Sequence, residues 1–588
     1  MDKPLKAAAS GALVLARWRY LVAVAALVAL PVVAAWHIAG LQVMPDRDRG
    51  FAFLQSQGAA RTVRVEPIPA YRGVISDRRG EPLAVSTPVV SLWANPQLVV
   101  GDDDRVISLA RALGVDAGQL QGRLEQFRNK EFMYLARQLT PDEADKVLRL
   151  DIAGVHGQQE YKRFYPAGEV VAQLVGFTNI DDRGQEGMEL AYERQLAGVP
   201  GAKRVIKDLK GRVIKDLELV RSEKPGKNLT LSIDLRLQYL AYRELKAAIG
   251  RFQAASGSVV VVDVRSGEIL AMVNQPSYNP NDRTRLDTSA MRNRAVTDLV
   301  EPGSLMKPLT VVAALESGKF TPDSIIDTSP GYVRVENKTF VDHSNYGPLT
   351  VTGILTKSSQ VGITKIALEL PPEHIRDVFE RVGLGRDTGT GFPGESVGSL
   401  PGKQRWRAIE RATFAFGYGL SATPLQLAQA YAVLANNGVH QPVSLLKREA
   451  GAGVVPGEQV IDPAVALAVR TMLQNVTLPG GTGTRAAIPA YAVAGKTGTA
   501  HKVGAEGYQK SRYISLFAGM VPVHNPRLVT VVVVNDPQGG SYFGGLVAAP
   551  VFARVTADAL RLLNIAPELP DGKQALARDS KVARGDKT

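Results

Sequence analysis

One stretch decides the fold of this chain: Glu301-Pro302-Gly303-Ser304-Leu305-Met306-Lys307-Pro308. Residues 309–316 are compatible with a helix that ends at Ser317-Gly318, and proline is tolerated only in the first turn of a helix. The helix is therefore expected to begin close to Ser304. On this helix Ser304 and Lys307 share one face, so that a neutral lysine amine could take the proton of the serine hydroxyl. The pattern predicts a nucleophilic serine.

Two further elements follow this serine in the order typical of penicillin-interacting acyl-serine enzymes. The second element of such enzymes is Ser-x-Asn, and here it falls at Ser358-Ser359-Gln360, with glutamine as the amide. The third element is Lys496-Thr497-Gly498-Thr499, which the apolar residues 491–495 precede, as expected for a strand. A second Ser-x-x-Lys occurs at 444–447, but no other catalytic motif surrounds it. A literal Ser-x-Asn occurs at 277–279, but it lies ahead of the nucleophile in the sequence. We interpret both as coincidences.

Longer motifs surround these elements, and through them the sequence resembles the class B penicillin-binding proteins, among them the division-specific septal transpeptidases. The resemblance extends from about residue 72 to residue 552. Its carriers are residues 72–84 (RGVISDRRGEPLA), 163–168 (RFYPAG), 391–395 (GFPGE), 416–419 (FGYG), 480–484 (GGTGT) and 542–550 (YFGGLVAAP). The resemblance implies an α+β fold with a single N-terminal transmembrane helix, an elongated pedestal domain and a penicillin-recognising transpeptidase domain, whose antiparallel sheet is packed with helices.

The N-terminal region has the pattern of a membrane anchor. Residues 20–41 carry no formal charge, and a helix of that length spans about 30 Å, the thickness of the hydrocarbon core of a bilayer. The run is too long for the apolar part of a signal peptide, and Trp36-His37 interrupts the region where cleavage would occur, so we expect an uncleaved anchor. Basic residues precede the run, which puts the short tail in the cytoplasm and the rest of the chain across the membrane.

The rest of the chain shows the pattern of two domains. Residues 256–264 and 269–273 are predicted as a hairpin of a central sheet, and strands return near 492–494, 513–520 and 528–534 after a mostly helical stretch. We expect a cytoplasmic tail at 1–19, a transmembrane helix at 20–41, a periplasmic pedestal domain of the dimerisation type at 42–227, a transpeptidase domain at 228–567 and a disordered tail at 568–588.

Composition sets independent bounds on function. With 588 residues, of which 45% are hydrophobic and 22% charged, the chain is globular and long enough for more than one domain. It has no cysteine, which excludes disulfides, thiolate metal sites and a cysteine nucleophile. The histidines form no ligand pair and no phosphate-binding glycine loop is present, so we expect no metal and no cofactor. The net charge of +13 suits an anionic membrane surface or a lipid-linked pyrophosphate better than nucleic acid, because acidic residues are interspersed.

The resemblance implies a role for each residue at the reacting centre. Ser304 would attack the carbonyl of the penultimate D-alanine of a peptidoglycan stem peptide, with Lys307 as general base. A lysine can act as a base only if its pKa is lowered, and the charge of Lys496 would contribute to this. Ser358 would relay the proton to the departing D-alanine, and an amine from a neighbouring stem would then replace water as acceptor. A β-lactam would acylate the same serine.

The resemblance also assigns residues to substrate binding. The element Thr497-Gly498-Thr499 would line the substrate, with the hydroxyl groups of its two threonines on the terminal carboxylate. The backbone N–H groups of Ser304 and Thr499 would form the oxyanion hole, where the loss of one donor costs about 3 to 4 kcal/mol.

Gln360 departs from the family pattern, because its side chain has one methylene more than asparagine. Displacing a preorganised group by about 1 Å can cost up to about a hundredfold in rate. We therefore expect a slower or more specialised paralogue of the septal enzyme. Three alternatives stay open: a low-activity or non-catalytic scaffold or β-lactam sensor, a hydrolase of β-lactams or D-Ala-D-Ala peptides, and a transpeptidase of elongation rather than division.

The resemblance finally implies a location and partners. The protein would be a single-pass protein of the bacterial inner membrane, with its catalytic domain in the periplasm. Its substrates would be peptidoglycan stem peptides and the lipid-linked precursor. A multi-spanning glycan polymerase would bind through residues 20–41 and the pedestal, together with other division proteins.

Overall fold

The structure, a computed structural model, describes most of the chain. The described residues are 16–42, 53, 56–58, 62–99, 103–208, 213–284, 287–402, 405–448, 456–504 and 507–568. Contacts divide the chain into two compact units: Met1–Ala70, Val89–Glu160 and Val199–Lys224 form the first unit, and Tyr71–Pro88, Tyr161–Gly198 and Pro225–Thr588 form the second. This division differs from the predicted boundary at 227 and 228, because two earlier segments belong to the second unit. The predicted boundary stays a prediction of the sequence.

Helix α1 (Arg17–Gln42) belongs to the first unit and is apolar on all sides beyond its first turn. It is long and apolar enough to cross a membrane over Arg17–Ala39, and none of that window is buried inside the protein. The helix begins at Arg17 instead of the predicted Tyr20, so its first turn carries the basic residues Arg17 and Arg19. Residues 1–15 of the predicted tail lie outside the described residues.

The rest of the first unit combines strands with three short helices. Strands β1 (Val63–Ile68), β6 (Gly201–Lys207) and β7 (Val213–Arg221) form an antiparallel three-stranded sheet in that order. Strand β4 (Met133–Leu139) pairs with the end of β3 (Pro82–Ala94), which β5 (Val155–Phe164) also joins. Of these two longer strands, only residues 89–94 and 155–160 belong to the first unit. The helices are α4 (Asp103–Leu113), α5 (Ala117–Gln126) and α6 (Pro141–Leu148), and α3 (Pro96–Val99) is a single turn. Their apolar faces enclose a small core around Leu92, Leu109 and Leu124.

A five-stranded antiparallel sheet organises the second unit. Its strands follow the order β10 (Ile269–Gln275), β9 (Ser256–Asp263), β19 (Leu528–Asn535), β18 (Gly507–Val521) and β17 (Ala494–Gly504). The predicted hairpin and the predicted strands near 513–520 and 528–534 are thus confirmed, whereas the strand predicted near 492–494 overlaps β17 only at Ala494. Alternate side chains of β9 enter different cores: Val259 and Val261 face one core, and Val260 and Val262 face the other.

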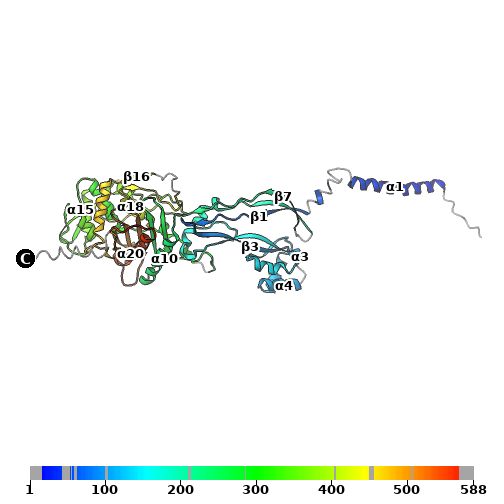
Figure 1. The fold of residues 1–588 in the computed structure, drawn as a ribbon, viewed down its shortest axis with the longest axis horizontal. Coiled ribbons are helices and arrows are strands. Elements are labelled where there is room, and N and C mark those ends of the chain that lie inside the picture. Colours follow the sequence, from blue (N-terminus) through cyan, green and yellow to red (C-terminus); the bar gives the residue numbers. More distant parts are fainter. Residues whose placement is uncertain are drawn as a thin grey trace, which may run out of the picture. The chain divides into compact units, whose positions relative to one another are not determined.

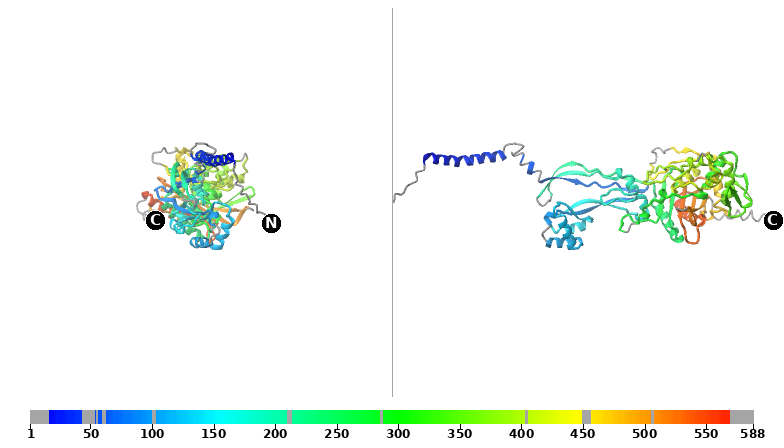
Figure 2. Two further views of the ribbon diagram at one scale, coloured as in Figure 1. Left: turned by 90° about the vertical axis from the view of Figure 1, so that its right-hand side faces the viewer. Right: turned by 180° about the vertical axis from the view of Figure 1, so that it is seen from behind.

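Helices cover both faces of this sheet. Helices α10 (Leu235–Phe252) and α20 (Gly544–Leu562) pack together on one face, although they stand near opposite ends of the unit's sequence. Figure 1 and the right-hand view of Figure 2 both show the red to orange α20 within this sheet-and-helix body. Helix α18 (Pro424–Ala435), every residue of which is buried, contacts β9 and β19 within the larger core on the opposite face.

Shorter elements fill the sequence between β10 and β17 and close the larger core. The helices are α11 (Thr288–Met291), α12 (Arg294–Thr297), η2 (Gly303–Met306), α13 (Lys307–Glu316), α14 (Val351–Lys357), α15 (Gln360–Glu369), α16 (Pro372–Arg381), α17 (Ala408–Ala415), α19 (Pro463–Gln474) and η3 (Thr484–Ala486). The short strands are β11 (Ile325–Asp327), β12 (Tyr332–Val335), β13 (Lys338–Val341), β14 (Pro348–Thr350), β15 (Val439–His440) and β16 (Glu458–Gln459). The sequence predicted mainly helix here, and the β12–β13 hairpin differs because its tight turn uses Glu336 at φ +52°.

The N-terminal part of the second unit is held by a buried ion cluster. Its elements are strands β2 (Ile75–Ser76) and β8 (Leu229–Thr230), and the short helices η1 (Gly168–Val170), α7 (Ala172–Val175), α8 (Gly187–Ala191) and α9 (Glu193–Leu196). The Glu189 carboxylate accepts hydrogen bonds from Arg72 Nε–H and from Arg163 Nε–H, at 2.6 Å each. The three side chains are at most 1% exposed. The charged boxes at 72–84 and 163–168 thus meet on one carboxylate. At the other end of the unit, the Glu568 N–H donates to the Ala490 carbonyl, and the predicted tail from residue 569 lies outside the described residues.

Candidate active site

Ser304 lies on the tight turn η2, which leads directly into α13. The turn depends on two glycines, because Gly303 adopts φ +55° and Gly417 packs against its backbone. The Gly303 N–H donates to the Gly417 carbonyl at 3.2 Å, and a Cβ atom on Gly417 would lie 2.3 Å from the Gly303 carbonyl oxygen. The Tyr431 hydroxyl donates to the Leu305 carbonyl at 2.8 Å. These contacts fix the backbone beside the half-buried Ser304.

Ser358 lies at the junction of two helices. It ends α14 in the left-handed region at φ +58°, where residues other than glycine are uncommon, and Ser359 then caps α15. The Ser358 hydroxyl oxygen accepts from Lys496 Nζ at 2.9 Å and from Lys307 Nζ at 3.2 Å. Lys307 Nζ also donates to the Ser358 carbonyl at 2.5 Å. The structure therefore brings the three elements predicted from the sequence together at one hydroxyl.

Both lysines of this cluster are completely buried. Burial lowers the pKa of Lys307 to about 7, although the negative charge of Asp342 acts in the opposite direction. Burial lowers the pKa of Lys496 well below its ordinary value, and the charge of Lys307 lowers it further. The sequence analysis expected the charge of Lys496 to lower the Lys307 pKa, whereas burial is the main cause here. A neutral amine near pH 7 can accept a proton from a serine hydroxyl.

Strand β17 supplies the third element and ends the strand order of the sheet. The Thr497 hydroxyl lies 2.8 Å from the Thr482 hydroxyl, and the Thr499 hydroxyl oxygen accepts the Gly544 N–H at 3.0 Å. A Cβ atom on Gly498 would lie 3.1 Å from Leu305 Cγ and 3.2 Å from the Pro302 carbonyl oxygen. Glycine therefore lets this strand approach the turn that carries Ser304.

Gln360 is the first residue of α15 and is half-buried. Its backbone N–H donates to Asp342 Oδ1 at 2.5 Å. Among the described residues its side-chain amide has no hydrogen-bond partner. The two coincidental motifs lie apart from the cluster: Ser277 donates to the Glu169 carbonyl, and Ser444 donates to the Leu446 carbonyl.

Sequence reasoning missed Asp342, which follows β13. Its carboxylate accepts hydrogen bonds from the Ser359 hydroxyl at 2.5 Å, the Gln360 N–H at 2.5 Å and the Val361 N–H at 3.0 Å. The only signal in the sequence is an aspartate after a short strand pattern. That signal does not indicate contact with a helix that begins eighteen residues later in the chain.

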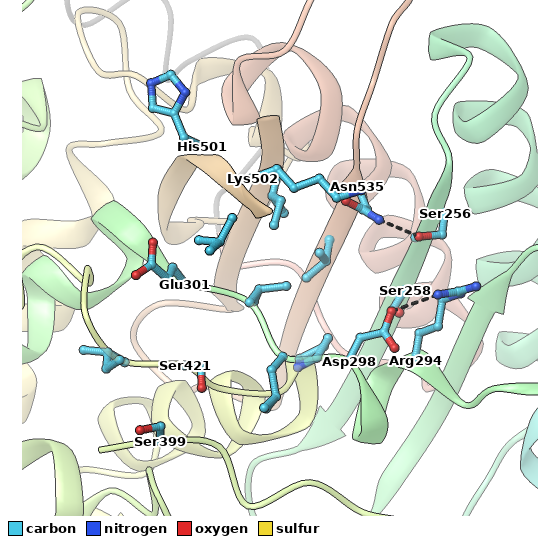
Figure 3. A pocket seen from close by; sticks show the side chains of 18 of the residues that line it. Ser256, Ser258, Arg294, Asp298, Glu301, Ser399, Ser421, His501, Lys502 and Asn535 are labelled. Atoms are coloured by element: carbon cyan, nitrogen blue, oxygen red, sulfur yellow. Dashed lines mark hydrogen bonds and ion pairs between the residues drawn. The ribbon is translucent and has the colours of Figure 1, made fainter. Parts of the chain in front are cut away.

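A cavity of about 520 Å³ adjoins the segment that precedes Ser304. Figure 3 shows that Glu301, Ser421 and His501 border one side of it, opposite Ser256 and Asn535. Glu301 Oε1 accepts from the Gly419 N–H at 2.9 Å and from the Tyr508 hydroxyl at 3.0 Å, which ties this segment to the β17–β18 hairpin. The residues that line this cavity do not include the lysine and serine cluster. Within the described ranges, no group of three or more His, Cys, Asp or Glu side chains could hold a metal ion.

The sheet flanked by helices, together with the buried lysines on either side of a serine hydroxyl, defines a penicillin-recognising serine enzyme. Comparisons with known proteins make this more specific. Residues 257–557 match the penicillin-binding protein transpeptidase domain, and residues 67–231 match the penicillin-binding protein dimerisation domain. The chain therefore belongs to the class B penicillin-binding proteins, the peptidoglycan D,D-transpeptidases.

Individual relatives agree with this assignment. The chain is 46% identical over 537 residues to the peptidoglycan D,D-transpeptidase FtsI of Escherichia coli (strain K12), a match that covers 90% of this chain and 89% of that protein. The transpeptidase domain of Burkholderia pseudomallei penicillin-binding protein 3 is 42% identical, with a TM-score of 0.54, and covers 58% of this chain and 98% of its own. Penicillin-binding protein 3 of Mycobacterium tuberculosis, solved in complex with aztreonam, is 26% identical with a TM-score of 0.66, and the match covers 86% of this chain and 100% of that chain.

Proposed function

We propose that this protein cross-links peptidoglycan stem peptides through an acyl-enzyme on Ser304 during septal cell-wall synthesis. One observation carries the proposal: two buried lysines share the Ser358 hydroxyl beside the turn that presents Ser304. A buried amine with a lowered pKa can act as a base at neutral pH.

The reaction proceeds in two halves. In the first half Ser304 Oγ attacks the carbonyl carbon of the penultimate D-alanine and gives its proton to Lys307 Nζ. The bond between this carbon and the nitrogen of the terminal D-alanine breaks, and the departing nitrogen takes a proton through the Ser358 hydroxyl. In the second half an amine of a neighbouring stem attacks the ester carbon and loses a proton to the same relay. The new amide bond forms as the ester bond between the acyl carbon and Ser304 Oγ breaks, and Ser304 Oγ regains its proton from the relay.

The substrate would lie along the outer edge of β17. The terminal carboxylate of the substrate would accept hydrogen bonds from the hydroxyl groups of Thr497 and Thr499. Thr482 and Gly544 hold these two hydroxyl groups in place. Gly498 leaves room for the turn that carries Ser304. The backbone N–H groups of Ser304 and Thr499 would stabilise the oxyanion. Gln360 would complete the site by reaching the amide of the substrate.

A β-lactam would acylate the same serine, since its strained amide lies near a carboxylate as in the terminal D-Ala-D-Ala. The aztreonam complex of the Mycobacterium tuberculosis relative supports this extension. The resulting ester persists because the opened ring keeps the leaving amine attached to the acyl group.

The protein would be anchored in the inner membrane by α1, with the pedestal and transpeptidase domains in the periplasm. The apolar and unburied α1 supports this, as do the basic residues of its first turn. We expect the tail at 1–19 to lie in the cytoplasm and the pedestal at 42–227 to act as a spacer. The transpeptidase domain at 228–567 would carry out the reaction. A multi-spanning glycan polymerase, other division proteins and the lipid-linked precursor would be the partners.

One observation favours a second function. The side chain of Gln360 has no hydrogen-bond partner in the described part of the chain, which suits a low-activity paralogue that serves as a scaffold or β-lactam sensor. The intact lysine pair opposes this alternative, because burying two lysine side chains is costly and a protein without catalysis gains nothing from it.

Intact-protein mass tests the proposed function. The full chain in detergent is incubated with benzylpenicillin, beside Ser304→Ala and the matched control Ser444→Ala, which alters the other Ser-x-x-Lys motif. We expect one stable adduct on the parent and on Ser444→Ala, and none on Ser304→Ala. An unmodified parent would contradict the proposal and favour the scaffold. Rapid loss of the adduct would favour a hydrolase.

A further inference from the structure

We propose that Asp342 is a positioning residue of the acyl-serine site, which fixes the start of α15 beside Ser358 and places a negative charge near the buried Lys307. The inference rests on the proposed function and extends it to a residue outside the three sequence elements. It concerns a residue that acts through Ser358 and Lys307 and does not touch the substrate.

The contacts of Asp342 form a cap for α15 that comes from another part of the chain. Its carboxylate accepts from the Ser359 hydroxyl at 2.5 Å and from the Gln360 and Val361 N–H groups at 2.5 and 3.0 Å. The Ser359 hydroxyl oxygen in turn accepts the Gly362 N–H at 2.9 Å. A carboxylate at a helix N-terminus satisfies free N–H groups and interacts favourably with the helix dipole.

This cap controls the position of Ser358, since only Ser359 separates Ser358 from α15. Ser358 holds a left-handed backbone conformation at φ +58°, and both its carbonyl and its hydroxyl contact Lys307 Nζ. A loosened start of α15 would let this strained residue relax and move away from the lysines. Displacements of about 1 Å can cost up to about a hundredfold in rate.

The charge of Asp342 has a separate effect. The charged groups that face Lys307 are Asp342, after β13, and Lys496, on β17. Tyr346 also faces Asp342, whose charge contributes to raising the Tyr346 pKa. Asp342 is 8% exposed, so solvent screens its interaction with Lys307 only weakly. It therefore keeps the Lys307 pKa higher than burial alone would, and its removal lowers that pKa below about 7.

Acylation kinetics over a range of pH separate these two effects. The full chain in detergent reacts with benzylpenicillin between pH 5 and 9, beside Asp342→Asn, Asp342→Glu and the control Asp462→Asn. Asp462 is a matched control because it caps α19 by accepting the Ala464 and Val465 N–H groups. Asparagine keeps the size and one acceptor oxygen of Asp342 but loses the charge, whereas glutamate keeps the charge.

We expect Asp342→Asn to lower the maximal acylation rate about tenfold or more and to shift the rising limb of the profile to lower pH. Asp342→Glu should keep the rising limb of the pH profile where it lies in the parent. Asp462→Asn should change neither the position of this limb nor the maximal acylation rate. An Asp342→Asn profile identical to that of the parent would overturn the inference. If Asp342→Asn lowers the maximal acylation rate but leaves the rising limb of the pH profile unshifted, the inferred role of the Asp342 charge is overturned. An unreactive parent would instead refute the proposed function, so the two failures are distinguishable.

Discussion

Lys307 and Lys496 point their ammonium nitrogens at the same oxygen atom, the hydroxyl of Ser358, at 3.2 and 2.9 Å. The two side chains come from α13 and β17, and neither is exposed to solvent. Two like charges at one oxygen repel each other, so the pair favours states with at least one neutral amine. Under the proposed function, Lys307 is the base for Ser304.

The acylation rate should therefore depend on pH through the state of Lys307. Burial lowers its pKa to about 7, and only the neutral amine can take the serine proton. We expect the second-order rate constant with benzylpenicillin to rise about tenfold per pH unit below pH 7 and to level off above it. Quenched-flow mixing followed by intact-protein mass spectrometry measures this profile. A rate that is constant from pH 5 to 9 would show that Lys307 is not the base.

The substitution Gln360→Asn tests the departure from the family pattern. The Gln360 carboxamide has no hydrogen-bond partner among the described residues, and asparagine at the same helix start would have one rotatable bond fewer. We expect acylation by benzylpenicillin to become up to about tenfold faster, since a better preorganised amide costs less to align. Gln509→Asn serves as a control for the chemical change alone. Slower acylation by Gln360→Asn would mean that the pocket is built around glutamine.

Much of this site could be predicted from the sequence because its elements are local. The spacing from Ser304 to Lys307 and the Lys496 to Thr499 run each lie within one turn or strand, and periodicity places such runs without knowledge of the fold. The hairpin β9–β10 is equally local, since a short turn joins two runs of apolar residues.

The rest of the site depends on contacts that no local pattern encodes. Asp342 reaches α15 from a separate hairpin, and Gly417 supports Gly303 from a loop more than a hundred residues later. The boxes around Arg72 and Arg163 likewise meet only through a long-range contact, because both arginines bind the Glu189 carboxylate. Burial, which dominates the Lys307 pKa, likewise follows from the assembled core.

Gly417→Ala should damage the turn that carries Ser304. Both Gly417 and Gly419 have positive φ, so alanine at either site costs about 1 to 2 kcal/mol of backbone strain. Only at Gly417 would the new Cβ atom meet backbone, 2.3 Å from the Gly303 carbonyl oxygen, whereas at Gly419 nothing lies within 4 Å. We expect Gly417→Ala to reduce the acylation rate at least about tenfold more than Gly419→Ala. Equal rates in the two variants would show that the turn adapts.

Glu189→Gln should destabilise the second unit strongly, because the carboxylate is the shared counter-charge of two buried arginines. Arg72 retains Glu193 at 2.7 Å, but among the described residues Arg163 pairs with no other carboxylate. Removing one partner of a buried ion pair costs about 3 to 5 kcal/mol, since a charge is left without compensation. Asp377→Asn is the control: its pair with Arg381 is 62% exposed on the aspartate side and should contribute at most about 1 kcal/mol. Urea unfolding of both variants, followed by circular dichroism, compares the two losses. Similar midpoints would mean that the cluster relaxes around glutamine, and that hydrogen bonds from Arg163 to the Gly73 carbonyl and the Ser86 hydroxyl suffice to hold it.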